Sequence, residues 1–201
     1  MTTADDLIVR CRAAWFGFER PFLGPLDAVV SRGARWAITG PNGCGKSLFL
    51  KGLVNKTLVY SGAVVLSAQV RVTLLAQEHP RPRPWPLSGW DWFSVMGTRP
   101  PELAGVRKLL ERRLDRLSGG QWQLLRLAAA VSPLNDGWSG DRLVLLDEPG
   151  NHLDEKVRVD AMGLIANMAP GTTLLLTSHD AAFATALGVE IIPLQVLTQR
   201  V

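Results

Sequence analysis

Hydrophobic and polar positions follow two patterns along the chain, short apolar runs and longer segments with the period of a helix. The apolar runs cover residues 35–39, 63–66, 70–76, 142–146 and 172–176. Apolar positions recur with a helical period in residues 46–55 and again from residue 155 onward. Strands that alternate with helices in this order predict an α/β fold with a mainly parallel sheet flanked by helices.

The region between residues 77 and 117 has a different pattern. Residues 79–86 contain four prolines and cannot lie inside a helix or a central strand. Beyond them, a helix is predicted by the spacing of Leu103, Val106, Leu109, Leu110 and Leu114. We therefore expect one domain, with a catalytic core at about residues 1–77 and 136–201 and a reduced helical subdomain inserted at about residues 78–135.

Composition places the chain among soluble globular proteins. Of its 201 residues, 47% are hydrophobic and 20% charged, which is enough to bury the core of one domain. No apolar run approaches the ~18 residues that span a membrane, and the first ten residues do not resemble a secretory signal. Two cysteines are too few for a disulfide scaffold or a zinc site, which predicts a cytoplasmic protein. The net charge of +4 does not by itself select a nucleic acid as partner.

Residues 40–47 read GPNGCGKS and match the phosphate-loop pattern G-x-x-x-x-G-K-[ST]. They follow a predicted strand and precede a predicted helix, as the pattern requires. Glycines let the backbone aim its N–H groups at phosphate oxygens, and the helix adds its positive N-terminal end. Lys46 supplies a cation for the β- and γ-phosphates, the Ser47 hydroxyl can ligate Mg²⁺, and Cys44 is a small filler.

Two carboxylates end the predicted strand at residues 142–146. Asp147 is placed to hold Mg²⁺ directly or through water, and Glu148 to accept a proton from an attacking water. The carboxyl ends of parallel strands form the edge at which open α/β sheets bind ligands. An Asp-Glu pair alone is a weak signal, but together with the phosphate loop it predicts a nucleotide-hydrolysing site.

A pentapeptide between these two motifs narrows the choice of protein family. Residues 117–121 read LSGGQ, which most phosphate-loop folds lack. With LLDEP at residues 145–149 and TSHD at residues 177–180, the motif order resembles that of the ATP-binding cassette (ABC) ATPases. The resemblance extends from about residue 16 to residue 180. It implies a RecA-like P-loop NTPase core, hydrolysis of ATP with Mg²⁺, and a head-to-tail dimer with two composite sites.

The resemblance also implies roles for single residues. Gln77, at the end of a predicted strand, would sense Mg²⁺ and link the core to the helical subdomain. His179 would bond the γ-phosphate, and Asp154 would contact the partner across the dimer interface. Phe16 would stack on adenine, with the adjacent Trp15 and Phe18 as alternatives.

The expected site residues form four groups. ATP is expected to contact Phe16, Gly40, Pro41, Asn42, Gly43, Cys44, Gly45, Lys46, Ser47 and Leu48. The motif expected to reach the partner's γ-phosphate is Ser118, Gly119, Gly120 and Gln121. The expected catalytic residues are Lys46, Gln77, Glu148 and His179, and the expected Mg²⁺ ligands are Ser47, Gln77 and Asp147.

The sequence leaves two biological roles open. Residues 85–97 resemble a segment of transporter ATPases that helps form the groove for a membrane subunit. This predicts a paired cassette, with itself or with another cassette, that powers a transmembrane permease from the cytoplasmic face of the inner (plasma) membrane. The alternative rests on residues 151–154, NHLD, which resemble the translation-factor branch that acts on ribosomes. No direct nucleic-acid contact is expected, because the arginine-rich residues 107–116 are interpreted as a solvated helix face.

Overall fold

The computed structural model describes residues 6–77, 86–151 and 153–198. The chain forms two compact units. One, here the sheet unit, comprises residues 1–76, 140–148 and 170–201, and the other, the helical unit, comprises residues 77–139 and 149–169. The proline-rich residues 79–86 are here called the connector. Residues 79–85 of the connector and residue 152 lie outside the described residues.

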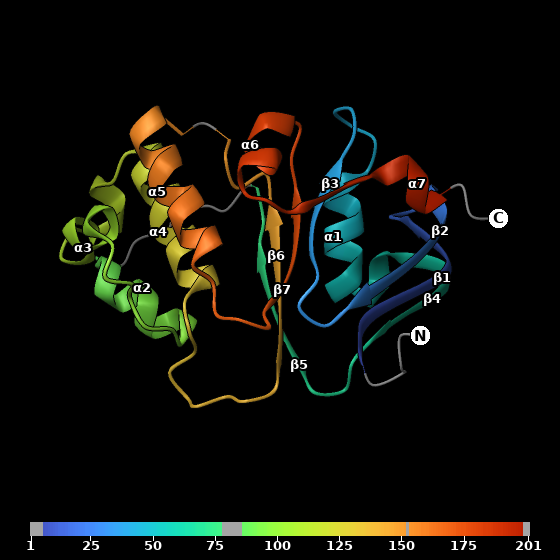
Figure 1. Ribbon diagram of the computed structural model, residues 1–201, viewed down its shortest axis with the longest axis horizontal. Helices are drawn as coiled ribbons and strands as arrows, with labels where there is room; N and C mark the ends of the chain where they lie inside the picture. Colours follow the sequence, from blue (N-terminus) through green and yellow to red (C-terminus); the bar gives the residue numbers. More distant parts are fainter. Residues whose placement is uncertain (1–5, 78–85, 152, 199–201) are drawn as a thin grey trace. The chain divides into compact units, whose positions relative to one another are not determined.

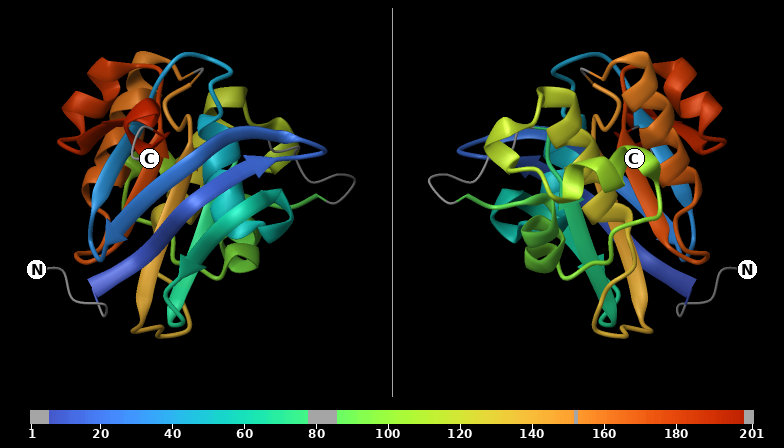
Figure 2. Two further views of the ribbon diagram at one scale, coloured as in Figure 1. Left: turned by 90° about the vertical axis from the view of Figure 1, so that its right-hand side faces the viewer. Right: turned by 90° about the vertical axis from the view of Figure 1, so that its left-hand side faces the viewer.

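The sheet unit contains a parallel sheet and an antiparallel sheet (Figure 1). The parallel sheet has the order β5 (Val70–Leu75), β6 (Asp141–Asp147), β7 (Thr173–Thr177), β3 (Arg35–Thr39) and β8 (Glu190–Pro193). The antiparallel sheet has the order β2 (Pro21–Ser31), β1 (Leu7–Gly17) and β4 (Val59–Leu66), and its strands lie side by side in Figure 2. The helices are α1 (Lys46–Val54), α6 (Ala181–Ala186) and α7 (Leu194–Thr198), with the short η2 (Lys56–Leu58).

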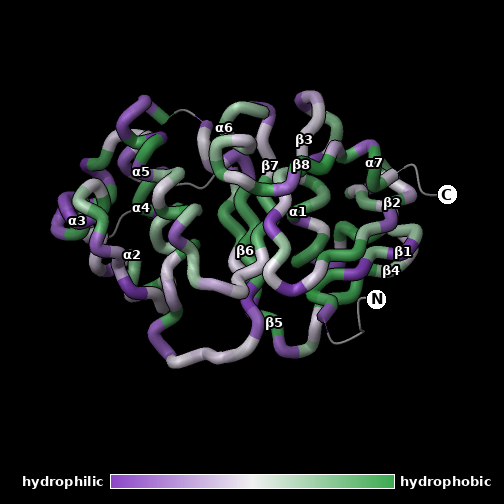
Figure 3. Tube along the Cα trace, in the orientation of Figure 1, coloured by the Kyte–Doolittle hydropathy of each residue, from purple (hydrophilic) through white to green (hydrophobic). Residues whose placement is uncertain are grey.

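The sequence pattern of the parallel strands explains their position. Every residue of β6 and β7 is buried, as expected of parallel strands covered on both faces, and Figure 3 shows β6 as largely hydrophobic. All four pairings in this sheet are parallel. The predicted fold class, a mainly parallel sheet flanked by helices, is confirmed.

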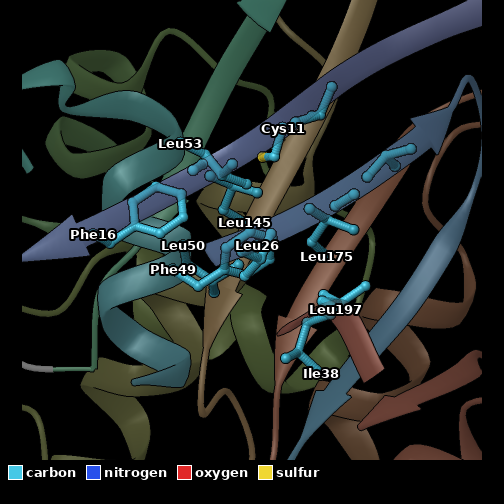
Figure 4. Packing of buried hydrophobic residues seen from close by; sticks show 14 of the residues in the cluster. Cys11, Phe16, Leu26, Ile38, Phe49, Leu50, Leu53, Leu145, Leu175 and Leu197 are labelled. Carbon is cyan, nitrogen blue, oxygen red and sulfur yellow. The ribbon is translucent and has the colours of Figure 1, made fainter. Parts of the chain in front are cut away.

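Helix α1 contributes to a core that joins both sheets (Figure 4). Its buried apolar side chains are Leu48, Phe49, Leu50 and Leu53, and they cluster with residues of β1, β2, β6 and β7. The rings of Phe16 and Phe49 meet edge to face at 5.9 Å. Gly52 makes this approach possible, because a Cβ there would lie 2.2 Å from Phe16 Cδ1. This packing fixes α1, and therefore the loop before it, against the strands.

The helical unit contains α2 (Gly89–Met96), α3 (Ala104–Leu110), η3 (Leu114–Arg116), α4 (Gly119–Val131) and α5 (Glu155–Ala166). Helix α4 is its centre, since nearly all of its side chains from Trp122 onward are buried. Trp92 of α2 packs on Trp122 at a ring distance of 4.9 Å. Residues 149–169, expected in the catalytic core, belong to this unit because α5 packs along α4.

Candidate nucleotide site

The phosphate loop, residues 40–47, connects the end of β3 to the start of α1. Gly43 and Gly45 have φ angles of 77° and 105°, in the left-handed region that glycine adopts without strain. Gly45 is the N-cap of α1 and makes no side-chain cap, so the first turn of the helix keeps its N–H groups available. This arrangement of a turning backbone and a helix N-terminus suits a bound phosphate.

The side chain of Lys46 is buried and folds back along the phosphate loop. Its Nζ atom donates hydrogen bonds to Gly40 O at 2.9 Å and to Pro41 O at 3.0 Å. The same atom lies 3.9 Å from Glu148 Oε1. The ammonium group is therefore held beside the loop, where a phosphate group would meet it.

Asp147 is the last residue of β6, and its carboxylate is buried. Its Oδ1 accepts hydrogen bonds from Ser47 Oγ at 2.8 Å and from Thr177 Oγ1 at 2.7 Å. Its buried Oδ2 has no hydrogen-bond partner among the residues that the structure describes. A buried carboxylate oxygen without a donor is costly, and carboxylate with hydroxyl is the oxygen donor set that Mg²⁺ prefers. Ser47 and Asp147 therefore fit a divalent cation.

Glu148 follows directly and has a φ of 52°, an uncommon left-handed conformation for a residue other than glycine. Its own N–H donates to Thr177 Oγ1 at 3.0 Å. Its Oε2 lies 2.9 Å from His179 Nδ1 and accepts a longer bond, 3.3 Å, from the His179 N–H. Strained backbone is held only where surrounding contacts fix it, and it clusters at functional sites. Here the contacts aim a buried carboxylate beside the phosphate loop.

Thr177 is a residue of the candidate site that the sequence analysis did not identify. Its hydroxyl donates to Asp147 and accepts from the Glu148 backbone, so it fixes both carboxylate residues. Thr177 pairs with Asp147 across the parallel strands β6 and β7. The available signal was a hydroxyl residue at the end of a buried strand, immediately before the Ser-His-Asp segment.

The structure corrects the expectation for Phe16. Its side chain is fully buried in the core against Phe49 and Gly52, so it offers no face to a ligand. Of its aromatic neighbours, Trp15 is half-buried and Phe18 is 74% exposed. The side chain of Leu48 is also in the core, so this residue could offer ATP only its backbone.

The other loop residues stay accessible, as binding requires. Pro41, Asn42 and Gly43 are exposed, and Cys44 is half-buried with its N–H donating to Pro41 O at 3.4 Å. Gln77 is exposed two residues beyond β5 and is the first residue of the helical unit. Its expected roles stay predictions.

The LSGGQ segment forms the N-terminus of α4 in the helical unit. Ser118 is the N-cap, and its Oγ accepts a bond of 3.2 Å from the Gln121 N–H. The Gln121 Oε1 accepts one of 3.0 Å from the Ser118 N–H, which completes a capping box. Ser118 and Gly119 are exposed, so the start of this 13-residue helix is accessible. Asp154 caps α5 in a similar way, through a 2.9 Å bond from the Val157 N–H.

Comparison with known proteins gives concordant family matches. The sequence model described as ABC transporter matches residues 23–84. The vitamin B12 import ATP-binding protein BtuD of Salmonella heidelberg (strain SL476) is 32% identical over 184 residues, covering 81% of this chain and 73% of BtuD. The probable ATP-binding protein YbiT of Escherichia coli O157:H7 is 28% identical, covering 92% of this chain and 35% of YbiT.

Solved structures share the fold. A putative ABC transporter ATP-binding protein from Pyrococcus furiosus superposes with a TM-score of 0.74 at 17% identity, covering 95% of this chain and 99% of that one. A putative metal-chelate type ABC transporter in an inward-facing conformation superposes with a TM-score of 0.70 at 21% identity, covering 94% of this chain and 81% of that one. A dimeric bacterial ABC transporter cassette superposes with a TM-score of 0.67 at 19% identity, covering 89% of this chain and 91% of that one.

Proposed function

The chain belongs to the family of ABC transporter ATP-binding proteins, and from this premise we propose that it hydrolyses ATP with Mg²⁺ in a head-to-tail dimer, with Glu148 as general base. As a member of this family it is an ATPase. The observation that carries the residue assignment is one continuous hydrogen-bonded network. It runs from Ser47 through Asp147 and Thr177 to Glu148 and His179.

Each part of this network has a role in hydrolysis. Backbone N–H groups of the phosphate loop and the Lys46 ammonium hold the phosphates of ATP. Ser47 and Asp147 are the residues that would hold Mg²⁺, which when bound neutralises phosphate charge. Glu148 accepts a proton from water as the water oxygen bonds to the γ-phosphorus and the bond to the β-phosphate oxygen breaks. His179 keeps the Glu148 carboxylate oriented.

Other residues complete the site in this proposal. The signature turn, Ser118–Gln121, offers the N-terminus of α4 to the γ-phosphate bound by the partner subunit. Asp154 contacts the partner, and Gln77 connects the nucleotide to the helical unit. Phe18 takes the place of Phe16 as the aromatic that stacks on adenine, because it is exposed.

A transmembrane permease is the proposed partner of the dimer, whether the second cassette is identical or different. On α2, Trp90 is 52% exposed and Val95 is also exposed, which leaves apolar surface on the helix that follows the connector. None of the helices in the described parts of the chain combines the length and the apolar character needed to cross a bilayer. We place the protein at the cytoplasmic face of a membrane through its partner. The relatives' names support transport and give no support to the ribosomal alternative.

The composite site is tested by complementation between two inactive subunits. Lys46→Ala disables the phosphate loop, and Ser118→Arg places bulk and charge where the partner's γ-phosphate docks. A crosslinked heterodimer of the two keeps one site with neither lesion, so it should hydrolyse ATP while each crosslinked homodimer is inactive. Activity in the Ser118→Arg homodimer would contradict a site shared between subunits.

A further inference from the structure

The arginines of segment 107–116 differ in what their side chains contact. Arg107 and Arg113 form ion pairs with nearby carboxylates of the same unit, as expected of a solvated surface. Arg112 instead reaches the signature turn, where its Nη1 atom donates to Gln121 Oε1 at 3.3 Å. One arginine of this segment therefore contacts a motif that serves the nucleotide.

The oxygen that Arg112 contacts is the one that closes the capping box. Gln121 Oε1 also accepts the Ser118 N–H at 3.0 Å, while the Gln121 N–H donates to Ser118 Oγ at 3.2 Å. A hydrogen bond from a charged donor is stronger than one between neutral groups. Arg112 is therefore a further donor to the carboxamide oxygen of the capping box, and Gly119 and Gly120 lie within the turn that the box closes.

The backbone of Arg112 is itself anchored, so its guanidinium extends from a fixed place. The Gly89 N–H, in the first turn of α2, donates to Arg112 O at 3.1 Å, and the Leu114 N–H donates to Leu87 O at 2.8 Å. A Cβ at Gly89 would lie 2.6 Å from Leu109 O, which shows how closely the two segments approach. The backbone that carries the Arg112 side chain is therefore held next to the start of α2.

We infer that Arg112 is a positioning residue for ATP hydrolysis, which acts through the Gln121 carboxamide to hold the signature turn in the conformation required across the dimer. The inference rests on the proposed function, because the turn meets ATP only in a composite site. ATP binds first to the phosphate loop of its own subunit. Loss of Arg112 should therefore lower kcat by about 3- to 10-fold and leave KM for ATP nearly unchanged.

Steady-state ATPase kinetics on the full chain test this inference with matched variants. Arg112→Lys keeps a cationic donor and should restore most of the kcat lost in Arg112→Ala. Arg116→Ala removes the same charge from an exposed position two residues before Ser118, and it should leave kcat unchanged. In a Gln121→Ala background, Arg112→Ala should cause no further loss, because the group through which it acts is gone.

Three results would overturn the inference. These are a normal kcat for Arg112→Ala, an equal loss in Arg116→Ala, and an undiminished effect of Arg112→Ala in the Gln121→Ala background. Thermal unfolding of each variant checks that the fold persists. Ser118→Arg is assayed in parallel, and its inactivity together with an unaffected Arg112→Ala removes only this inference. An active Ser118→Arg protein would remove the proposed composite site as well.

Discussion

The Nδ1 atom of His179 lies 2.9 Å from Glu148 Oε2, and the backbone N–H of the same histidine donates to that oxygen at 3.3 Å. The two residues follow neighbouring parallel strands, where Asp147 pairs with Thr177. Strand register therefore brings them together. One residue contacts the carboxylate twice, which orients the proposed base while leaving Glu148 Oε1 directed toward Lys46 at 3.9 Å.

Replacing Glu148 by Gln should preserve ATP binding and abolish most of the turnover. The amide keeps the shape of the side chain but cannot accept the proton of the attacking water, which should cost about 10²- to 10⁴-fold in kcat. ATP should then hold the dimer closed, as size-exclusion chromatography with ATP would detect. Glu155→Gln, at an exposed carboxylate that begins α5, is the control and should hydrolyse ATP normally. Near-normal hydrolysis by the Glu148 variant would place the base elsewhere.

Thr177→Val should destabilise the fold and weaken hydrolysis together. Valine has nearly the same shape as threonine but removes the donor to Asp147 and the acceptor for the Glu148 N–H. A buried polar group left unpaired costs roughly 1–3 kcal/mol, which denaturant unfolding can measure. Thr177→Ser keeps the hydroxyl and should lose little activity. If the valine variant matched the serine variant in kcat, the hydroxyl would have no part in the site.

Alanine substitutions at Phe16 and Phe18 should distinguish a loss of core packing from a loss of nucleotide binding. Truncating the buried ring in Phe16→Ala should lower the free energy of unfolding by about 3–5 kcal/mol. Phe18→Ala removes an exposed ring, so stability should stay within about 0.5 kcal/mol while KM for ATP rises several-fold. Urea unfolding and ATPase assays on both variants give the comparison. An unchanged KM in Phe18→Ala would exclude stacking by this residue.

The sequence predicted those parts of the site whose residues lie close together along the chain. A phosphate loop is a contiguous motif between a strand and a helix, so residues 40–47 were found without knowledge of the fold. Asp147 and Glu148 were predicted because they follow an apolar run typical of a buried strand, and the structure makes Asp147 the last residue of the buried strand β6. The fold class and the family were predictable because four motifs in a fixed order constrain the chain that joins them. The comparisons with known proteins confirm the family.

Features that depend on irregular backbone could not be predicted. Strand β1 changes register between Cys11 and Ala14 and again before Phe16, and Ala13 has a φ of 43°. Side chains of a regular strand alternate between its faces, but a bulge disrupts that alternation. The sequence therefore could not determine which aromatic residue of the Trp15–Phe18 segment is buried. The link from Thr177 to Asp147 likewise depends on strand register between distant segments.

The proposed permease contact can be tested at Trp90. Residues 85–97, which resemble the segment of transporter ATPases that forms a groove for a membrane subunit, place three aromatic side chains on α2, and these differ in exposure. Trp90 is 52% exposed, whereas Trp92 is 7% exposed and Phe93 is buried. Trp90→Asp should therefore leave the free energy of unfolding and the ATPase of the isolated protein unchanged. It should remove attachment to membranes, because a charge replaces apolar surface at the contact.

The measurement is fractionation of cells that express wild type or variant, at moderate salt, where weak attraction of a basic protein to anionic lipids is screened. Val159→Asp is the matched control, because Val159 is also exposed in the helical unit but lies on α5 rather than α2. Wild type and the Val159 variant should sediment with membranes, and the Trp90 variant should not. Equal loss of sedimentation with membranes in both variants would indicate a general effect of added charge. Migration of all three proteins with ribosomes would contradict a transport role, since the change at α2 would then have no effect on the partner.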